Sequence, residues 1–121
     1  MAIEAKKKAD AEKGVESDVA DYVVVRLEQL APLCWEPIYR VISQHRKAAG
    51  GDIPILWVQE EPKNMGAWSF IRPRFNDLLK YMDYSTKVQY VGRAAAAAPA
   101  PGHGFMYDAE EKAIMEALWA N

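Results

Sequence analysis

The chain has 121 residues and a formal net charge of -2, with 26% charged residues, four Trp and six Tyr. This length suits one small domain that can bury a core, but not an enzyme that needs two cofactor domains. The balanced charge gives no reason to expect binding to nucleic acid or to a membrane surface. Since no apolar run approaches the roughly 20 residues of a spanning helix, we expect no membrane partner either.

The N-terminal residues 1–14 are rich in Ala, Glu and Lys and end at Gly14, which predicts a charged, solvated helix. This stretch contains Asp and Glu, unlike a secretory or transit sequence, so no targeting segment is visible. The single cysteine, Cys34, excludes an intramolecular disulfide, and a buried, inert thiol is expected. We divide the chain into this helix and an α/β domain over residues 15–121.

Two elements are predicted at the start of the domain. The β-branched run at 22–27 predicts a buried strand. After a turn with two prolines, apolar residues recur at helical spacing from Ile38 until Gly50, where the helix should end. His45 lies in this helix and is expected to be partly exposed, because no carboxylate or nucleophile stands in a motif relation to it.

The segment 53–70, IPILWVQEEPKNMGAWSF, predicts a strand, a loop and the start of a helix. Its apolar run at 55–58 is too short for a lone helix and suits a parallel strand, buried on both faces, that ends near Gln59. Asn64 could cap the following helix by accepting a backbone N–H two or three residues further on. The loop would then lie at the carboxyl end of a strand, where open α/β sheets usually carry ligands or interfaces.

The C-terminal half predicts three more elements and one irregular segment. A helix is expected over 65–82 with a break or kink at Pro73, followed by a third strand over 87–91. The alanine run at 94–98 is too short to nucleate a helix, and prolines follow it, so we expect an extended, well-packed segment. A last helix is predicted over 109–118.

Few residues suggest catalysis. Glu60 and Glu61 are neighbours on an extended chain and point to opposite sides, so they cannot act as a paired acid and base on one substrate atom. The chain also lacks a phosphate-binding glycine loop, a catalytic triad motif and enough His and Cys for a transition-metal site. We therefore expect no catalytic, cofactor-binding or metal-binding residue. The candidate loop or interface residues are Gln59, Glu60, Glu61, Asn64, Trp68 and Arg93.

Three strings resemble 2-oxoglutarate dehydrogenase, the thiamine-diphosphate-dependent first component of a multienzyme complex. They are VRLEQLAP at 25–32, WVQEEPKNMGAW at 57–68 and YVGRAAAAAPAPG at 90–102. The first looks like the family's V-R-L-E-Q-L-x-P, and the third like its Y-x-G-R-x-x-x-A-x-P-A-x-G. The strings occur in family order and at family spacing. The resemblance covers roughly Glu4 to the C-terminus and points to the transketolase-like C-terminal domain.

This resemblance implies a three-layer α/β domain, with helices flanking a mostly parallel sheet of at least three strands. A family strand of the form R-V-I-L-C-S-G-K has no counterpart here, so the first strand of the family fold is expected to be absent. In the family, thiamine diphosphate and magnesium are held by the two preceding domains, so this chain would bind neither. It would complete the subunit and contribute to the dimer.

The whole enzyme that the chain resembles decarboxylates 2-oxoglutarate in the tricarboxylic acid cycle. It passes the succinyl group to the lipoyl arm of the succinyltransferase component, in the mitochondrial matrix or in bacterial cytoplasm. Two other readings stay open. One is a free-standing interaction or regulatory module derived from this domain. The other is a small nucleotide- or anion-binding protein that uses Arg93 near a strand end.

The missing strand also predicts how the protein behaves in solution. The absent strand would lie beside residues 22–27. Without it, either the strand at 22–27 pairs directly with the strand at 53–58, or each of these two strands keeps an open edge. Open apolar edges favour association between chains. We therefore expect a self-associating protein with exposed apolar surface along Val23, Val25 and Ile55.

Overall fold

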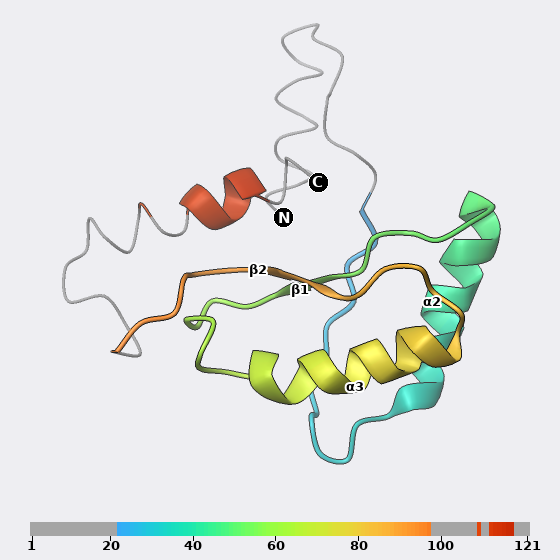
Figure 1. Cartoon of the computed structure of the whole chain (residues 1–121), viewed down its shortest axis with the longest axis horizontal. Coiled ribbons are helices and arrows are strands. Elements are labelled where there is room, and N and C mark those ends of the chain that lie inside the picture. The colour runs from blue at the N-terminus through green and yellow to red at the C-terminus, as the bar shows by residue number, and fades with distance from the viewer. Residues whose placement is uncertain (1–21, 98–108, 110–111, 118–121) are drawn as a thin grey trace, which may run out of the picture.

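A computed structural model describes residues 22–97, 109 and 112–117. The named elements are α2 (Trp35–Ala49), β1 (Leu56–Val58), α3 (Trp68–Tyr81) and β2 (Gln89–Val91). The two strands are parallel neighbours joined through α3, and α2 lies at one end of this unit (Figure 1). Their register pairs Leu56 with Gln89, Trp57 with Tyr90 and Val58 with Val91. The predicted α/β class and the parallel pairing are confirmed.

The helix α2 begins at Trp35, three residues before the predicted start at Ile38. Pro37 is tolerated there because the first turn of a helix needs no backbone N–H from it. Gly50 ends the helix as predicted: its φ of 74° is left-handed, and its N–H donates to the carbonyl oxygen of Lys47 at 3.2 Å.

The helix α3 runs without interruption through Pro73, so a break there, the first of the two predicted alternatives, is wrong, and the kink stays a prediction. Proline there removes one backbone donor, which is a local cost. Ile71 and Phe75 on either side of it are buried, however, and so is Leu79 one turn further on. Burial of this apolar face outweighs the lost hydrogen bond, because packing rather than propensity stabilises most helices in proteins.

The core lies between α2, α3 and the inner side of the strand pair. Phe75 is its meeting point: the ring of Trp35 from α2 lies 5.8 Å away and that of Trp57 from β1 lies 6.3 Å away, both edge-on. The buried members of this cluster are Ile38, Ile42, Trp68, Ile71, Phe75, Leu79, Met82 and Val88.

The strand predicted at 22–27 is wrong. In the described part of the chain this segment is extended but pairs with no strand, and the sheet has two strands rather than at least three. Val23, Val24 and Val25 are 59%, 74% and 51% exposed. A β-branched run becomes a strand only where a neighbour supplies hydrogen bonds and a packed face, and neither is present here among the described residues. Within this segment Leu27 packs against the core, as do Leu30 and Leu33 further along the chain.

Three further expectations need correction. Val58 is 46% exposed, so β1 is not buried on both faces. Cys34 is exposed rather than buried, since it lies in the turn that precedes α2. The alanines at 94–97 are non-helical as predicted, but only Ala96 is partly covered.

The predicted last helix is present at the described residues 109 and 112–117. The helix predicted at 1–14 lies outside the described residues, so the proposed division of the chain stays a prediction. No helix in the described part of the chain is both long and apolar enough to cross a bilayer.

Candidate functional site

Gln59, the first residue after β1, organises the loop between β1 and α3. Its side chain is buried, and the carboxamide oxygen accepts hydrogen bonds from the indole Nε1 of Trp57 at 2.8 Å and from the backbone N–H of Trp68 at 3.0 Å. The amide nitrogen donates to three backbone carbonyls. These belong to Glu61 at 3.2 Å, Pro62 at 3.1 Å and Met65 at 2.8 Å. Both ends of the amide are therefore engaged, and they fix the shape of the loop.

The same contact supplies the cap of α3. Its N-cap residue, Ala67, has no side chain that can accept a hydrogen bond, although the first turn of a helix leaves backbone donors unpaired. Gln59 provides the acceptor from nine positions earlier in the sequence. Asn64, which we predicted as the cap, does not perform this role.

Asn64 instead joins the loop to the segment that follows β2. Its Nδ2 donates to the carbonyl oxygen of Ala96 at 2.8 Å, and its Oδ1 accepts the N–H of Ala96 at 3.0 Å. A carboxamide has an oxygen that accepts and a nitrogen that donates, so it can bond both the backbone N–H and the backbone C=O of one residue. The start of a helix offers only N–H donors. Asn64 therefore pairs with the chain beyond β2 as a neighbouring strand would.

Tyr90 holds the exit of β2 against the same loop. Its hydroxyl donates to the carbonyl oxygens of Arg93 at 2.7 Å and Glu61 at 3.2 Å, and its ring lies 5.2 Å from that of Trp68. Burial raises the pKa of the Tyr90 phenol, an effect partly offset by hydrogen bonding to Gln59 and by the positive charge of Arg93. The phenol is thus held as a neutral donor.

Gly92 is required by this close approach of two segments of the chain, the exit of β2 and the residue that follows β1. A Cβ built at Gly92 would meet the hydroxyl of Tyr90 and lie 2.9 Å from the carbonyl oxygen of Gln59. Neither Tyr90 nor Gly92 was among the residues predicted from the sequence. A glycine directly after a strand is the signal that could have found this contact.

The structure gathers most of the predicted candidates at the carboxyl ends of both strands. Trp68 and Arg93 are each 7% exposed. Gln59 accepts the backbone N–H of Trp68, and Asn64 bonds to Ala96, three residues after Arg93. Glu60 is exposed, and the Glu61 side chain lies beside Gly66. We call the following set the strand-end cluster: Gln59, Asn64, Trp68, Tyr90, Gly92 and Arg93.

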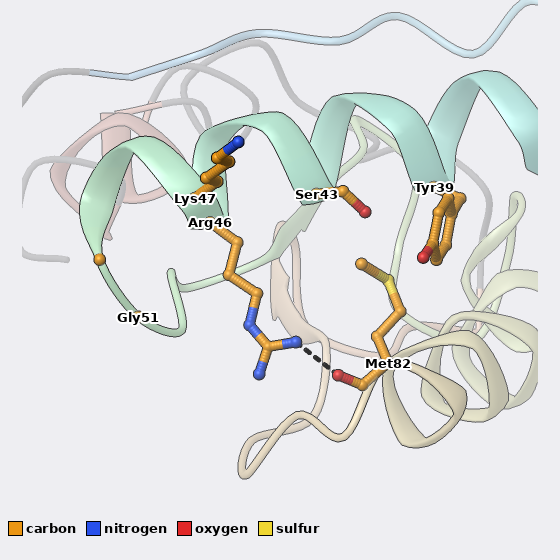
Figure 2. Close-up of a pocket in the computed structure, with 7 residues that line it drawn as sticks. Tyr39, Ser43, Arg46, Lys47, Gly51 and Met82 are labelled. Atoms are coloured by element: carbon orange, nitrogen blue, oxygen red, sulfur yellow. Dashed lines mark hydrogen bonds between the residues drawn. The ribbon is translucent and has the colours of Figure 1, made fainter.

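A second polar cluster, absent from the sequence predictions, lies at the opposite ends of the strands. Arg46 of α2 forms an ion pair with Asp52 at 2.7 Å, donates to the carbonyl of Met82 and lies 4.6 Å over the ring of Tyr84. Asp52 in turn accepts the backbone N–H of Ser85 at 2.8 Å and its hydroxyl at 2.9 Å. These two bonds, together with Arg46, hold the pKa of Asp52 below its usual value. A hollow of about 420 Å³ lies beside Arg46 (Figure 2).

The chemistry of both clusters is that of internal hydrogen bonding. Within the described ranges no three His, Cys, Asp or Glu side chains converge in a way that could hold a metal ion. The strand-end cluster uses its polar groups on the chain's own backbone. Fold and site therefore define an α/β domain in which a buried glutamine and an asparagine tie the ends of two parallel strands together.

Comparison with known proteins gives the family of this domain. Residues 5–119 match the model described as 2-oxoglutarate dehydrogenase C-terminal, and the chain belongs to this family. The resemblance seen in the three strings is confirmed. The family assignment rests on nearly the whole chain and not on those strings alone.

Individual relatives agree with this assignment. The chain is 44% identical over 106 residues to the mitochondrial 2-oxoglutarate dehydrogenase of Caenorhabditis elegans, a match covering 88% of this chain and 9% of that protein. It is 39% identical over 100 residues to the 2-oxoglutarate dehydrogenase E1 component of Rickettsia typhi, covering 82% and 10%. The E1 component of Brucella anthropi is 38% identical over 104 residues, covering 85% and 10%. The chain thus spans about a tenth of the length of these relatives.

Proposed function

We propose that this chain acts as the C-terminal structural and subunit-contact domain of a 2-oxoglutarate dehydrogenase. The observation that carries the proposal is the strand-end cluster. Its carboxamides are engaged by the chain's own backbone, so the described residues at the carboxyl ends of the strands present a fixed shape. Membership of the family and the names of the relatives support the same reading.

In this proposal the chemistry belongs to the rest of the enzyme. The described residues offer no group of converging carboxylates of the kind that magnesium prefers. The whole enzyme would decarboxylate 2-oxoglutarate and pass the succinyl group to the lipoyl succinyltransferase component. The direct partners of the domain would be the remaining domains of its own subunit and a second subunit, in the mitochondrial matrix or in bacterial cytoplasm.

A domain exchange tests this role. Replacing the matching segment of the Caenorhabditis elegans enzyme with this chain should preserve release of CO₂ from 2-oxoglutarate and the oligomeric state of the enzyme. The same exchange with the Gly92→Ala chain should lose both, because the strand ends would be displaced. A wild-type exchange that folds but yields an inactive enzyme would contradict the proposal.

The isolated chain supplies the complementary measurement. Purified alone, with thiamine diphosphate and magnesium added, it should release no CO₂ from 2-oxoglutarate. Turnover that follows the protein through successive chromatographic steps would overturn the assignment of chemistry to other domains.

The free-standing interaction module remains the second candidate, and the native mass in cell extract separates the two. A species near 13.6 kDa would indicate an independent protein, whereas a species many times larger would indicate a domain within the enzyme. The anion-binding alternative is disfavoured by the burial of Arg93, which is only 7% exposed and so offers little surface to a ligand in solution.

A further inference from the structure

Residues 23–33, which precede α2 and which we call the strap, lie outside the hydrogen-bonded framework of the domain. Figure 1 shows the strap as the blue trace that leads into α2. Among the described residues, its backbone takes part in no backbone–backbone hydrogen bond. Its polar side-chain contacts are internal: Arg26 pairs with Glu28 at 3.7 Å, and Gln29 Nε2 donates to the carbonyl oxygen of Ala31 at 3.3 Å. The backbone polar groups of the strap are therefore left to water.

Three leucines attach the strap to the core. Leu27, Leu30 and Leu33 recur at every third residue, and each is half-buried against the core cluster. The side chains between them are exposed, as are the valines at 23–25. Apolar stabilisation grows with the area removed from water, so half-buried leucines hold the strap less firmly than Leu79, only 1% exposed, holds α3. The strap is thus attached by partial apolar burial and not by its backbone.

The rest of the domain is held by contacts that do not pass through the strap. The rings of Trp35 and Phe75 join α2 to α3, and Arg46 ties the end of α2 to Asp52. The two strands pair with each other, and the carboxamide of Gln59 fixes the loop between β1 and α3. Detaching the strap breaks none of these contacts.

A hinge is available where the strap meets α2. Cys34 is the N-cap residue of this helix, it is exposed, and its side chain makes no capping hydrogen bond. Rotation about its backbone therefore breaks no side-chain contact of that kind and moves no buried group. The helix can keep its first turn while the chain before it changes direction.

We propose that the strap is a conformational device that lifts off the core about Cys34 while α2, β1, α3 and β2 stay folded. Segments with few buried contacts and a backbone exposed to water open at a lower free energy than the whole domain unfolds. The closed state covers the apolar surface beneath the three leucines, and the open state exposes that surface. The strap thus controls access to one side of the core. This inference does not depend on the subunit-contact role proposed above.

Limited proteolysis of the full 121-residue chain by trypsin tests the strap, because Arg26 lies within it. A protease binds an extended stretch on both sides of the bond that it cuts, so cleavage after Arg26 requires Leu27 to leave the core. Initial cleavage after Arg26 should be at least about a hundredfold faster than after Arg40 in the middle of α2, which requires unfolding of the domain. Adding about 1 M urea should accelerate the cut after Arg40 and leave the cut after Arg26 nearly unchanged, because opening the strap exposes little new surface.

Three variants separate an opening strap from a fixed exposed loop. Leu33→Ala weakens the attachment at the far end of the strap and should raise the rate of cleavage after Arg26 about threefold to thirtyfold, because the closed state loses apolar burial. Val58→Ala changes an apolar side chain of β1 that is 46% exposed, and as the matched control it should leave this rate unchanged. Leu79→Ala weakens the core itself and should accelerate only the cut after Arg40.

Two results would overturn the inference. Equal rates of cleavage after Arg26 in the wild-type chain and in Leu33→Ala would show that the cut does not pass through an opening of the strap. A cut after Arg26 that follows urea and Leu79→Ala as closely as the cut after Arg40 would show that the strap opens only when the whole domain unfolds. Circular dichroism of each variant checks that α2 and α3 are retained.

Discussion

Gln59 shows how one buried side chain can replace several local signals. Its carboxamide caps α3, receives the indole N–H of the preceding strand and satisfies three loop carbonyls. No shorter residue could reach all of these groups, and no charged residue could present both a donor and an acceptor. The conformation of the loop therefore depends on this position more than on the exposed glutamates beside it.

Gln59→Leu should be strongly destabilising although the two side chains have similar volume. The substitution leaves the N–H of Trp68 and several carbonyls without partners in a buried site, at roughly 1–3 kcal/mol per group. Partial relaxation and water entry limit the total, so we expect a loss of about 2–4 kcal/mol in a urea titration. Glu60→Gln, at the exposed neighbouring position, should stay within about 0.5 kcal/mol of wild type. Equal losses in the two variants would show that the hydrogen bonds of Gln59 contribute little.

Asp52 gives the protein a specific sensitivity to acid. Its pKa is lowered in the folded chain, so the carboxylate stabilises the fold above the unfolded-state pKa near 4, and this stabilisation is lost as the pH falls further. Asp52→Asn should flatten the stability curve below about pH 4, because the remaining amide no longer titrates. Urea midpoints measured from pH 2 to 7 provide the comparison, with the exposed Asp77→Asn as control. Parallel curves for wild type and Asp52→Asn would refute the assignment.

At the scale of the elements, the exit of β2 is the tightest point of the fold. The backbone of residue 92 passes between the Tyr90 hydroxyl and the Gln59 carbonyl with no room for a Cβ. This contact brings the ends of β1 and β2 together and allows the Lys63 N–H to donate to the carbonyl oxygen of Arg93 at 3.1 Å. The strand ends can meet only because position 92 carries no side chain.

Gly92→Ala should therefore destabilise the domain by about 1–3 kcal/mol, the range for overpacking a well-packed site. Gly51→Ala is the matched control: the same added methyl group would meet nothing within 4 Å. That control should be neutral or slightly stabilising, because alanine restricts the unfolded chain. Thermal unfolding of both variants decides the point, and a stability of Gly92→Ala equal to that of Gly51→Ala would contradict it.

The elements that were predicted correctly are those with a local cause. The left-handed glycine at the end of α2 and the apolar run of β1 act over a few residues, so the sequence displays them directly. The segment at 22–27 has the composition of a strand without a described neighbour, and Pro73 carries a helix breaker inside a face that packing holds. In both cases partners far away in the sequence decided the outcome.

The candidate site shows the same difference between local features, which the sequence predicts, and distant contacts, which it does not. The predicted end of β1 indicated that polar residues would gather after it, but it did not indicate which groups they would contact. Asn64 pairs with Ala96 and Tyr90 reaches back to Glu61, which no pattern within the loop reveals. The Arg46 cluster was missed for the same reason, since a lone arginine near a helix end reads as a solvated charge until the fold brings Asp52 and Met82 to it.

At the scale of the whole molecule, three polar links span nearly the same length of chain. Arg46 and Met82 are 36 residues apart, Asp52 and Ser85 are 33 apart, and Asn64 and Ala96 are 32 apart. All three links close loops that contain α3; the first two loops also contain β1, and the third contains β2. Because the entropic cost of closure is met largely by whichever link forms first, the later ones form at little further cost. Residues 46–96 should thus open and close as one cooperative unit, in which losing a link at either end of the strands loosens the other.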